Sequence, residues 1–138
     1  MTNIDLIARG IIVKDAKILL CKNLSKGHYY LPGGHIEQGE SEDQAFRREI
    51  QEEIGKEVEK VQRIIEVENE YVEDLIEMHE FISIYIVKLA DYNDVHSLED
   101  HIEFDWVPLK ELKTCGFKPE ESIDDILKCV KDNEGFWA

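Results

Sequence analysis

The chain has 138 residues with 16 Lys and Arg against 31 Asp and Glu, a formal net charge of −15, and 43% hydrophobic residues. The length suits one domain over residues 1–138, and the apolar fraction is high enough for a core, so disorder is not expected. The acidic balance excludes proteins that hold large nucleic acids or anionic membranes through a basic surface of their own.

The first third of the chain predicts strands that lead into a turn. Ile4–Val13 and Ala16–Lys22 are apolar, β-branched runs separated by Lys14-Asp15, a pattern typical of two strands joined by a tight turn. A shorter extended segment, His28–Leu31, follows. It ends at Pro32-Gly33-Gly34, which predicts a turn or loop.

A helix is predicted next. Ser41 stands where an N-cap belongs, and Gln44 three residues later completes a capping box. Glu42–Ile54 contains neither Gly nor Pro and reads as the helix itself, which Gly55 ends.

The remainder of the chain is mainly strand and closes with a helix. Val58–Val72 holds strand-like pieces without a clean period, and Phe81–Val87 is the strongest strand signal. A loop over residues 91–101 leads to a strand at Ile102–Val107, and a final helix spans Glu120–Val130. These elements predict an α+β domain, arranged as an α/β/α sandwich.

Carboxylates are concentrated in two segments. Residues 37–57 carry eight acidic side chains against three basic ones, and residues 64–105 carry thirteen against one. In the first segment Glu49, Glu52 and Glu53 share one face of the predicted helix, where they repel one another when unpaired. Such clustered oxygen ligands suit Mg²⁺ or Mn²⁺, so we expect a divalent cation at this face.

One motif carries a family resemblance. It resembles the Nudix box of the Nudix hydrolases, the MutT-like pyrophosphohydrolases that cleave nucleoside diphosphates linked to another moiety. All fixed positions of that box are filled, by Gly34-x5-Glu40-x7-Arg48-Glu49-Ile50-x-Glu52-Glu53-x-Gly55. The one departure is Lys56, where relatives usually have an aliphatic residue. The resemblance implies the Nudix fold, a mixed central sheet flanked by the box helix and a C-terminal helix.

The resemblance also implies a metal site and a reaction. The cation would be Mg²⁺, with Mn²⁺ as a substitute. Its ligands would be the carbonyl of Gly34 and the carboxylates of Glu49, Glu52 and Glu53, and Glu40 would support this site. Arg48 would orient a helix carboxylate through a charge-assisted hydrogen bond. A metal-activated water would attack one phosphorus of a pyrophosphate linkage.

The general base stays open at this point. In relatives it is either a box glutamate, here Glu49, or an acid on a loop before the last strand. The loop acid would be Glu99 or Asp100, with Glu103 a weaker candidate.

Substrate contacts are implied less specifically. Lys22 follows the second strand, where relatives often place a basic residue on the substrate phosphates, and Arg9 or Lys26 could serve similarly. Tyr71 is a hint of dinucleoside polyphosphate hydrolases. Three aromatic residues compete as stacking partners for a base, namely Tyr29, Tyr30 and Phe81.

A small nucleotide is therefore the expected partner: a nucleoside triphosphate, intact or oxidised, or a nucleotide sugar. Relatives that hydrolyse ADP-ribose often carry a proline about fifteen residues past the box. None occurs here between Pro32 and Pro108, which disfavours that substrate.

Rival functions stay open beside the hydrolase. One is a catalytically silent Nudix-fold nucleotide-binding module, although such modules usually lose box carboxylates. Another is an isomerase, which would need an active-site cysteine and a longer chain. A homodimer is a further open alternative, without a signal in the sequence.

The cellular compartment is inferred from cysteines and hydropathy. Cys21, Cys115 and Cys129 form no C-x-x-C pair, and three cysteines cannot all pair within the chain, which favours a reducing environment. No signal peptide is visible, and no stretch approaches about 18 consecutive apolar residues. We expect a cytoplasmic protein that does not enter the membrane.

Overall fold

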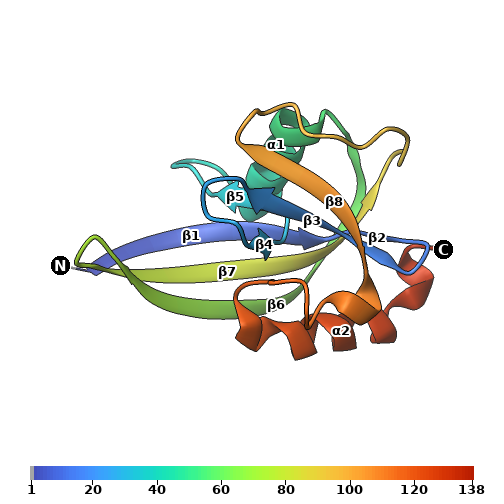
Figure 1. The fold of residues 1–138 in the computed structure, drawn as a ribbon. Helices are drawn as coiled ribbons and strands as arrows, with labels where there is room; N and C mark the ends of the chain where they lie inside the picture. Colours follow the sequence, from blue (N-terminus) through green and yellow to red (C-terminus); the bar gives the residue numbers. More distant parts are fainter. Residues whose placement is uncertain (1) are drawn as a thin grey trace.

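The computed structural model describes residues 2–138 and contains two four-stranded sheets between two helices (Figure 1). Strands of the first sheet follow the order β5-β1-β7-β6. In the second sheet β3 pairs with β8 along one edge, and with β2 and then β4 along the other edge. Helix α1 lies above the sheets in Figure 1 and α2 below them. The expected α+β arrangement is thus observed. The elements are β1 (Thr2–Ile11), β2 (Val13–Lys14), β3 (Lys17–Asn23), β4 (Tyr29–Tyr30), β5 (Gly33–His35), α1 (Glu42–Ile54), β6 (Val58–Glu73), β7 (Ile76–Leu89), β8 (Ile102–Pro108) and α2 (Ile123–Asp132).

The first sheet is mixed because β1 and β7 run parallel while its other pairs are antiparallel. Successive side chains of β7 point to opposite faces of the sheet. Ile84 and Ile86 enter the core shared with α2, whereas Tyr85 and Val87 enter the core shared with α1. Strand β7 is therefore apolar on both faces, which explains why Phe81–Val87 is a nearly continuous hydrophobic run.

Helix α1 begins and ends where the sequence predicted. The Ser41 Oγ accepts a hydrogen bond from the Gln44 N–H at 3.1 Å, and the Gln44 side chain accepts one from the Ser41 N–H at 2.9 Å. At the other end Gly55 adopts a left-handed φ of 67°. Phe46 is fully buried against Gly10 of β1, where any Cβ would overlap its ring. This contact sets how closely α1 approaches the sheet.

The expected turn at residues 32–34 is wrong in part. Gly33–His35 forms β5, which pairs antiparallel with β1. Gly33 has a φ of 130°, and a Cβ there would overlap the carbonyl oxygen of Ala8. These glycines permit a close backbone approach between strands, which a sequence pattern cannot distinguish from a turn.

The segment without a clean period is one long strand, β6. Its pairing with β7 shifts register between Val58 and Lys60 and again between Arg63 and Ile65. Each shift changes which side chains face the core, so the alternation is interrupted.

Strands β6 and β7 form a hairpin that extends beyond the rest of the molecule, beside the start of β1 (Figure 1). Asp74 and Leu75 make its turn, with φ values of 52° and 65°. Within residues 2–138, the structure contains no helix with the length and hydropathy needed to traverse a bilayer.

Candidate active site

A cavity of about 1120 Å³ is lined by residues of β1, β4 and β5, by the end of the 91–101 loop and by the β6–β7 hairpin. At one end it is lined by Gly34 of β5 and by Glu49 and Glu53 of α1, which we call the carboxylate end. Its volume is at the upper limit of what small-molecule sites usually have, so a whole nucleotide can be accommodated.

Close packing joins the three residues of the carboxylate end. A Cβ at Gly34 would lie 2.6 Å from Cδ of Glu49, so only glycine allows this approach. Glu53 is 4% exposed, and its Oε2 atom is buried without a hydrogen-bond partner in residues 2–138. Burial first, then the adjacent Glu49 carboxylate, raise the pKa of Glu53 to about 9.

Arg48 holds Glu49 in position. Its guanidinium donates to Glu49 Oε1 at 2.9 Å and to Glu40 Oε2 at 2.7 Å, and it also donates to the carbonyl of His35 at 3.2 Å. The Arg48 hydrogen bond lowers the pKa of Glu40. Arg48 thus ties the loop before α1, strand β5 and the helix into one unit.

The residues present fit a divalent cation. A buried carboxylate oxygen without a donor requires a positive charge or a proton, and the backbone of Gly34 borders it without a side chain. Of the expected carboxylate ligands Glu40, Glu49, Glu52 and Glu53, however, only Glu49 and Glu53 line the cavity. Glu52 is exposed and points toward Arg48, and no three His, Cys, Asp or Glu side chains among the described residues already form a metal-binding group.

Arg9 and Tyr30 form the wall next to the carboxylate end. Arg9 donates to the carbonyls of Leu31 and Gly33 at 3.2 and 2.8 Å, and its guanidinium lies 5.0 Å from the centre of the Tyr30 ring. Its positive charge opposes the rise in the pKa of Glu53 that burial and Glu49 cause. Both side chains line the cavity.

The loop after β7 brings one acid into the cavity. The N–H of Leu98 donates to the carbonyl of Glu53 at 2.7 Å, which ties this loop to the end of α1. Ser97 Oγ accepts from the N–H of Glu99 at 3.1 Å and donates to its carbonyl at 2.8 Å. Glu99 lines the cavity, whereas Asp100 does not.

Three other expected contacts lie elsewhere. Cys21 of β3 faces Tyr30 and Glu53. Because successive residues of a strand point to opposite faces, Lys22 points away from them. Its Nζ lies 5.2 Å from the centre of the Tyr29 ring. The Tyr29 hydroxyl donates to Asp105 at 2.6 Å, outside the cavity lining. Phe81 belongs to the opposite face of the sheet and borders a smaller hollow.

The β6–β7 hairpin lines one side of the cavity and includes Tyr71. A second wall is formed by the loop between β3 and β4 and by the segment 117–122 before α2. Phe117 and Lys118 line this second wall and were missed from the sequence. They are held there by a parallel bridge between Tyr29 and Phe117, residues 88 positions apart in the chain, for which no local sequence signal exists.

Comparison with known proteins gives matches over most of the chain. The family model for the NUDIX domain matches residues 5–126. An ADP-ribose pyrophosphatase of Methanocaldococcus jannaschii is 34% identical over 122 residues, 86% of this chain and 70% of that protein. An uncharacterised Nudix hydrolase of Nostoc sp. is 29% identical over 100 residues, 72% of this chain and 57% of that protein.

Solved structures share the fold. The crystal structure of a MutT NUDIX hydrolase from Burkholderia pseudomallei superposes with a TM-score of 0.73 at 22% identity, covering 91% of this chain and 98% of that one. At this identity the likeness establishes the fold alone.

Proposed function

The chain belongs to the NUDIX domain family and is a pyrophosphohydrolase of that family, and we propose that it hydrolyses a nucleoside diphosphate linked to another moiety with a divalent cation at the carboxylate end. Mg²⁺ is the proposed cation, with Mn²⁺ as a substitute. The observation that carries this proposal is the buried Oε2 of Glu53, which lies near Gly34 and Glu49 and has no hydrogen-bond partner within residues 2–138.

The chain's own residues divide the work in this proposal. Glu53 and Glu49, with the Gly34 carbonyl, hold the cation, and Arg48 fixes the orientation of Glu49. A bound divalent cation would offset phosphate charge and make a water a better nucleophile. Arg9, held by two backbone carbonyls, presents its remaining N–H groups to the substrate phosphates.

Glu99 is the proposed general base. It enters the cavity close to the carboxylate end, whereas Glu49 already accepts a hydrogen bond from Arg48. Its loop is fixed to α1 through Leu98, so the carboxylate can be placed reproducibly relative to the attacked phosphorus.

ADP-ribose becomes the first substrate to test, although the missing proline disfavoured it. The reason is the 34% identical relative whose name is ADP-ribose pyrophosphatase. Nucleoside triphosphates, nucleotide sugars and dinucleoside polyphosphates follow, the last because Tyr71 lines the cavity.

The experiment is product release from this panel of substrates with Mg²⁺, with Mn²⁺ and with EDTA. We expect hydrolysis of at least one substrate that requires the cation and falls roughly 10³-fold in Glu53→Gln. Glu66→Gln, an exposed acid of β6, is the matched control and keeps full activity. Full activity of Glu53→Gln would contradict the metal assignment, and a substrate bound but never hydrolysed would favour the silent module.

A further inference from the structure

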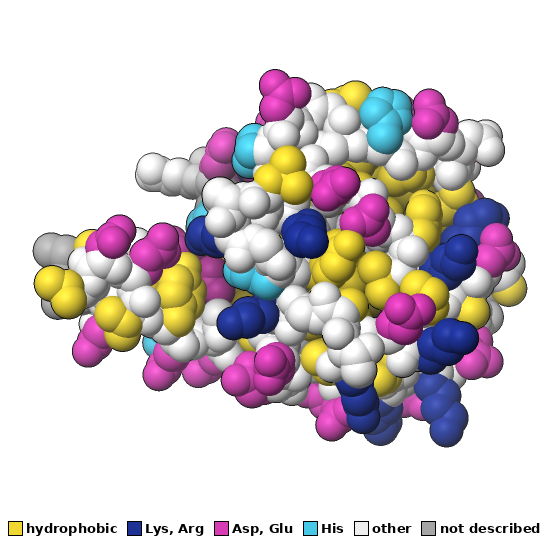
Figure 2. All heavy atoms as spheres, in the orientation of Figure 1, with side chains coloured by type: hydrophobic (Ala, Val, Ile, Leu, Met, Phe, Trp, Pro, Cys, Tyr) yellow, Lys and Arg dark blue, Asp and Glu magenta, His cyan; other side chains and the backbone are white. Residues whose placement is uncertain are grey.

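Three cationic or titratable side chains gather on one rim of the cavity, and we call Lys26, His28 and Lys118 the basic rim. All three line the cavity. They come from two loops that are held together, because the N–H of Lys118 donates to the carbonyl of Tyr29 at 2.9 Å and the N–H of Tyr29 to that of Gly116 at 3.1 Å. Figure 2 shows Lys or Arg side chains beside a histidine on the face between the hairpin and the rest of the molecule.

The lysines of the basic rim have no ion-pair partner in the described residues. The protein has almost twice as many acidic as basic side chains, yet neither Lys26 nor Lys118 forms an ion pair within residues 2–138. Glu120 and Glu121 also line the cavity but are not within ion-pair distance of either lysine. Unpaired lysines that face one cavity are available to bind an external anion.

Tyr30 connects the basic rim to the carboxylate end. On one side its ring lies 5.0 Å from the guanidinium of Arg9, and on the other its centre lies 6.1 Å from that of His28. Arg9 is close enough to Glu53 to affect its pKa. The Tyr30 ring separates Arg9 from the basic rim, so the rim is farther from the carboxylate end than Arg9 is.

Electrostatics indicate that the rim residues are mutually close. Burial first, then the positive charges of Lys118 and Lys26, lower the pKa of His28. Its ring is consequently neutral near pH 7 and can donate one hydrogen bond beside the two ammonium groups.

We propose that the basic rim is a second anion-binding subsite of this cavity, which binds a phosphate group of the substrate beyond the pyrophosphate that is cleaved. The subsite rests on the proposed function, because its distance from the carboxylate end matters only if hydrolysis occurs there. The substrate class that this subsite favours is a nucleotide with more than two phosphates in its chain. ADP-ribose and nucleotide sugars, whose far end is uncharged, would leave the subsite empty.

The test uses two compounds that share both nucleosides and differ only in phosphate number, diadenosine diphosphate and diadenosine tetraphosphate. The wild type should prefer the tetraphosphate in kcat/KM. In Lys26→Ala/Lys118→Ala that preference should fall about tenfold through KM, the size expected for two solvent-exposed charge contacts, while the diphosphate changes less than twofold.

A binding measurement keeps this test independent of catalysis. Tripolyphosphate titrated in EDTA should bind the wild type, and the double variant should bind it about tenfold more weakly. Lys110→Ala/Lys131→Ala removes two other exposed lysines without ion pairs in the described residues and is the control, which should match the wild type.

The outcomes separate the subsite from the proposed function. Equal losses on both dinucleotides, or unchanged tripolyphosphate binding in the double variant, would overturn the subsite even if hydrolysis is robust. If no substrate is hydrolysed, the proposed function fails, and the tripolyphosphate titration by itself decides whether the basic rim binds phosphate.

Discussion

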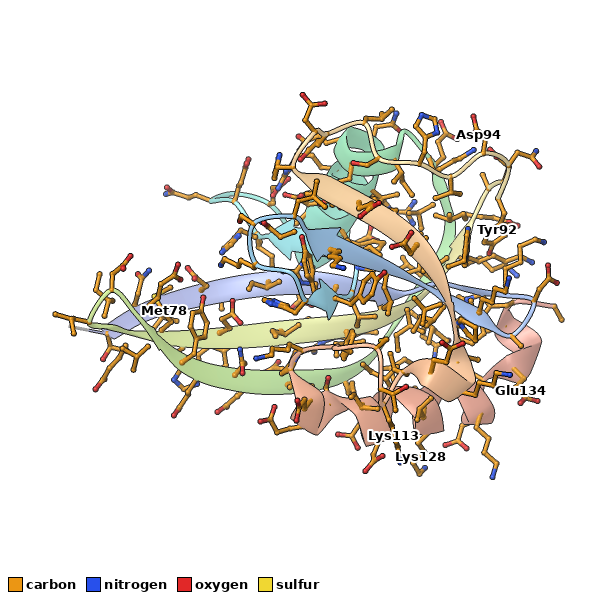
Figure 3. All side chains as sticks on the ribbon, in the orientation of Figure 1. Met78, Tyr92, Asp94, Lys113, Lys128 and Glu134 are labelled. Carbon is orange, nitrogen blue, oxygen red and sulfur yellow. The ribbon has the colours of Figure 1, made fainter. Side chains whose placement is uncertain are left out.

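Two acidic regions of this molecule differ in what their carboxylates can do. On α1, Glu49 and Glu53 are packed against Gly34, and Glu53 is 4% exposed. On the outer part of the β6–β7 hairpin the acids come from both strands and from the turn, and almost all are exposed; they are Glu66, Glu68, Glu70, Glu73, Asp74, Glu77 and Glu80. Figure 3 shows the hairpin side chains around Met78 spreading outward from both strands. The acids of α1 are therefore the candidate for a cation site, because burial and convergence withhold water from them.

The largest effect is expected from removing the proposed general base, Glu99, which belongs to the acidic segment 64–105. Glu99→Gln should lower kcat roughly 10²- to 10⁴-fold, the range for loss of a positioned general base. Asp100→Asn, a change to the next residue in the chain, should leave kcat within about twofold. If Glu99→Gln stays active, Glu99 is not the base, and no acid of the loop before β8 takes part in the way proposed.

Next in size is the loss of the close approach at the carboxylate end. Gly34→Ala places a methyl group where Glu49 lies, so Glu49 must move and kcat/KM should fall about 10²-fold. Circular dichroism should show an unchanged fold. Gly135→Ala, with open space around its Cβ position, is the control. Full activity of Gly34→Ala would mean that Glu49 need not be held there.

Cation binding should stabilise one region and not the other. Mg²⁺ at about 100 times its Kd should stabilise the wild type by about 2.7 kcal/mol, seen as a rise in Tm. Glu53→Gln should lose this rise, whereas Glu68→Gln/Glu70→Gln on the hairpin should keep it. A shift that depends on the hairpin acids would place cation binding on the exposed surface instead.

The change in stability per pH unit of the metal-free protein should be the smallest effect. The pKa of Glu53 is raised to about 9 when folded, so between its ordinary value and pH 9 the folded chain retains a proton that the unfolded chain has lost. Stability in EDTA therefore falls as pH rises over that window, by at most about 1.4 kcal/mol per pH unit from this group. Glu53→Gln should flatten the slope of Tm against pH, and Glu66→Gln should not. An unchanged slope in Glu53→Gln would contradict the raised pKa.

Local signals account for what the sequence predicted well. Ser41, Gln44 and Gly55 specify the limits of α1 because capping involves groups within a few residues. The helical repeat likewise predicted a shared face for Glu49 and Glu53. It did not predict that Glu52, on the same face, would turn to Arg48 and solvent.

Strand residues were harder to place. Lys22 and Phe81 lie on strands that were predicted, yet each points away from the cavity. A strand has two faces, and a single residue of register decides which one a side chain occupies. The register shifts of β6 interrupt its alternation, so the residue pattern of that strand does not tell which face each side chain occupies.

The sequence by itself determined the helix, its caps, the strand-rich α+β class and the carboxylate motif, because all of these depend on residues close together in the chain. Only the tertiary structure decided which carboxylate is buried, that Glu99 rather than Asp100 enters the cavity, and that Lys26 and Lys118 share a rim. These features depend on strand register and on contacts between distant loops, whose free energy comes from the folded arrangement and not from local preference.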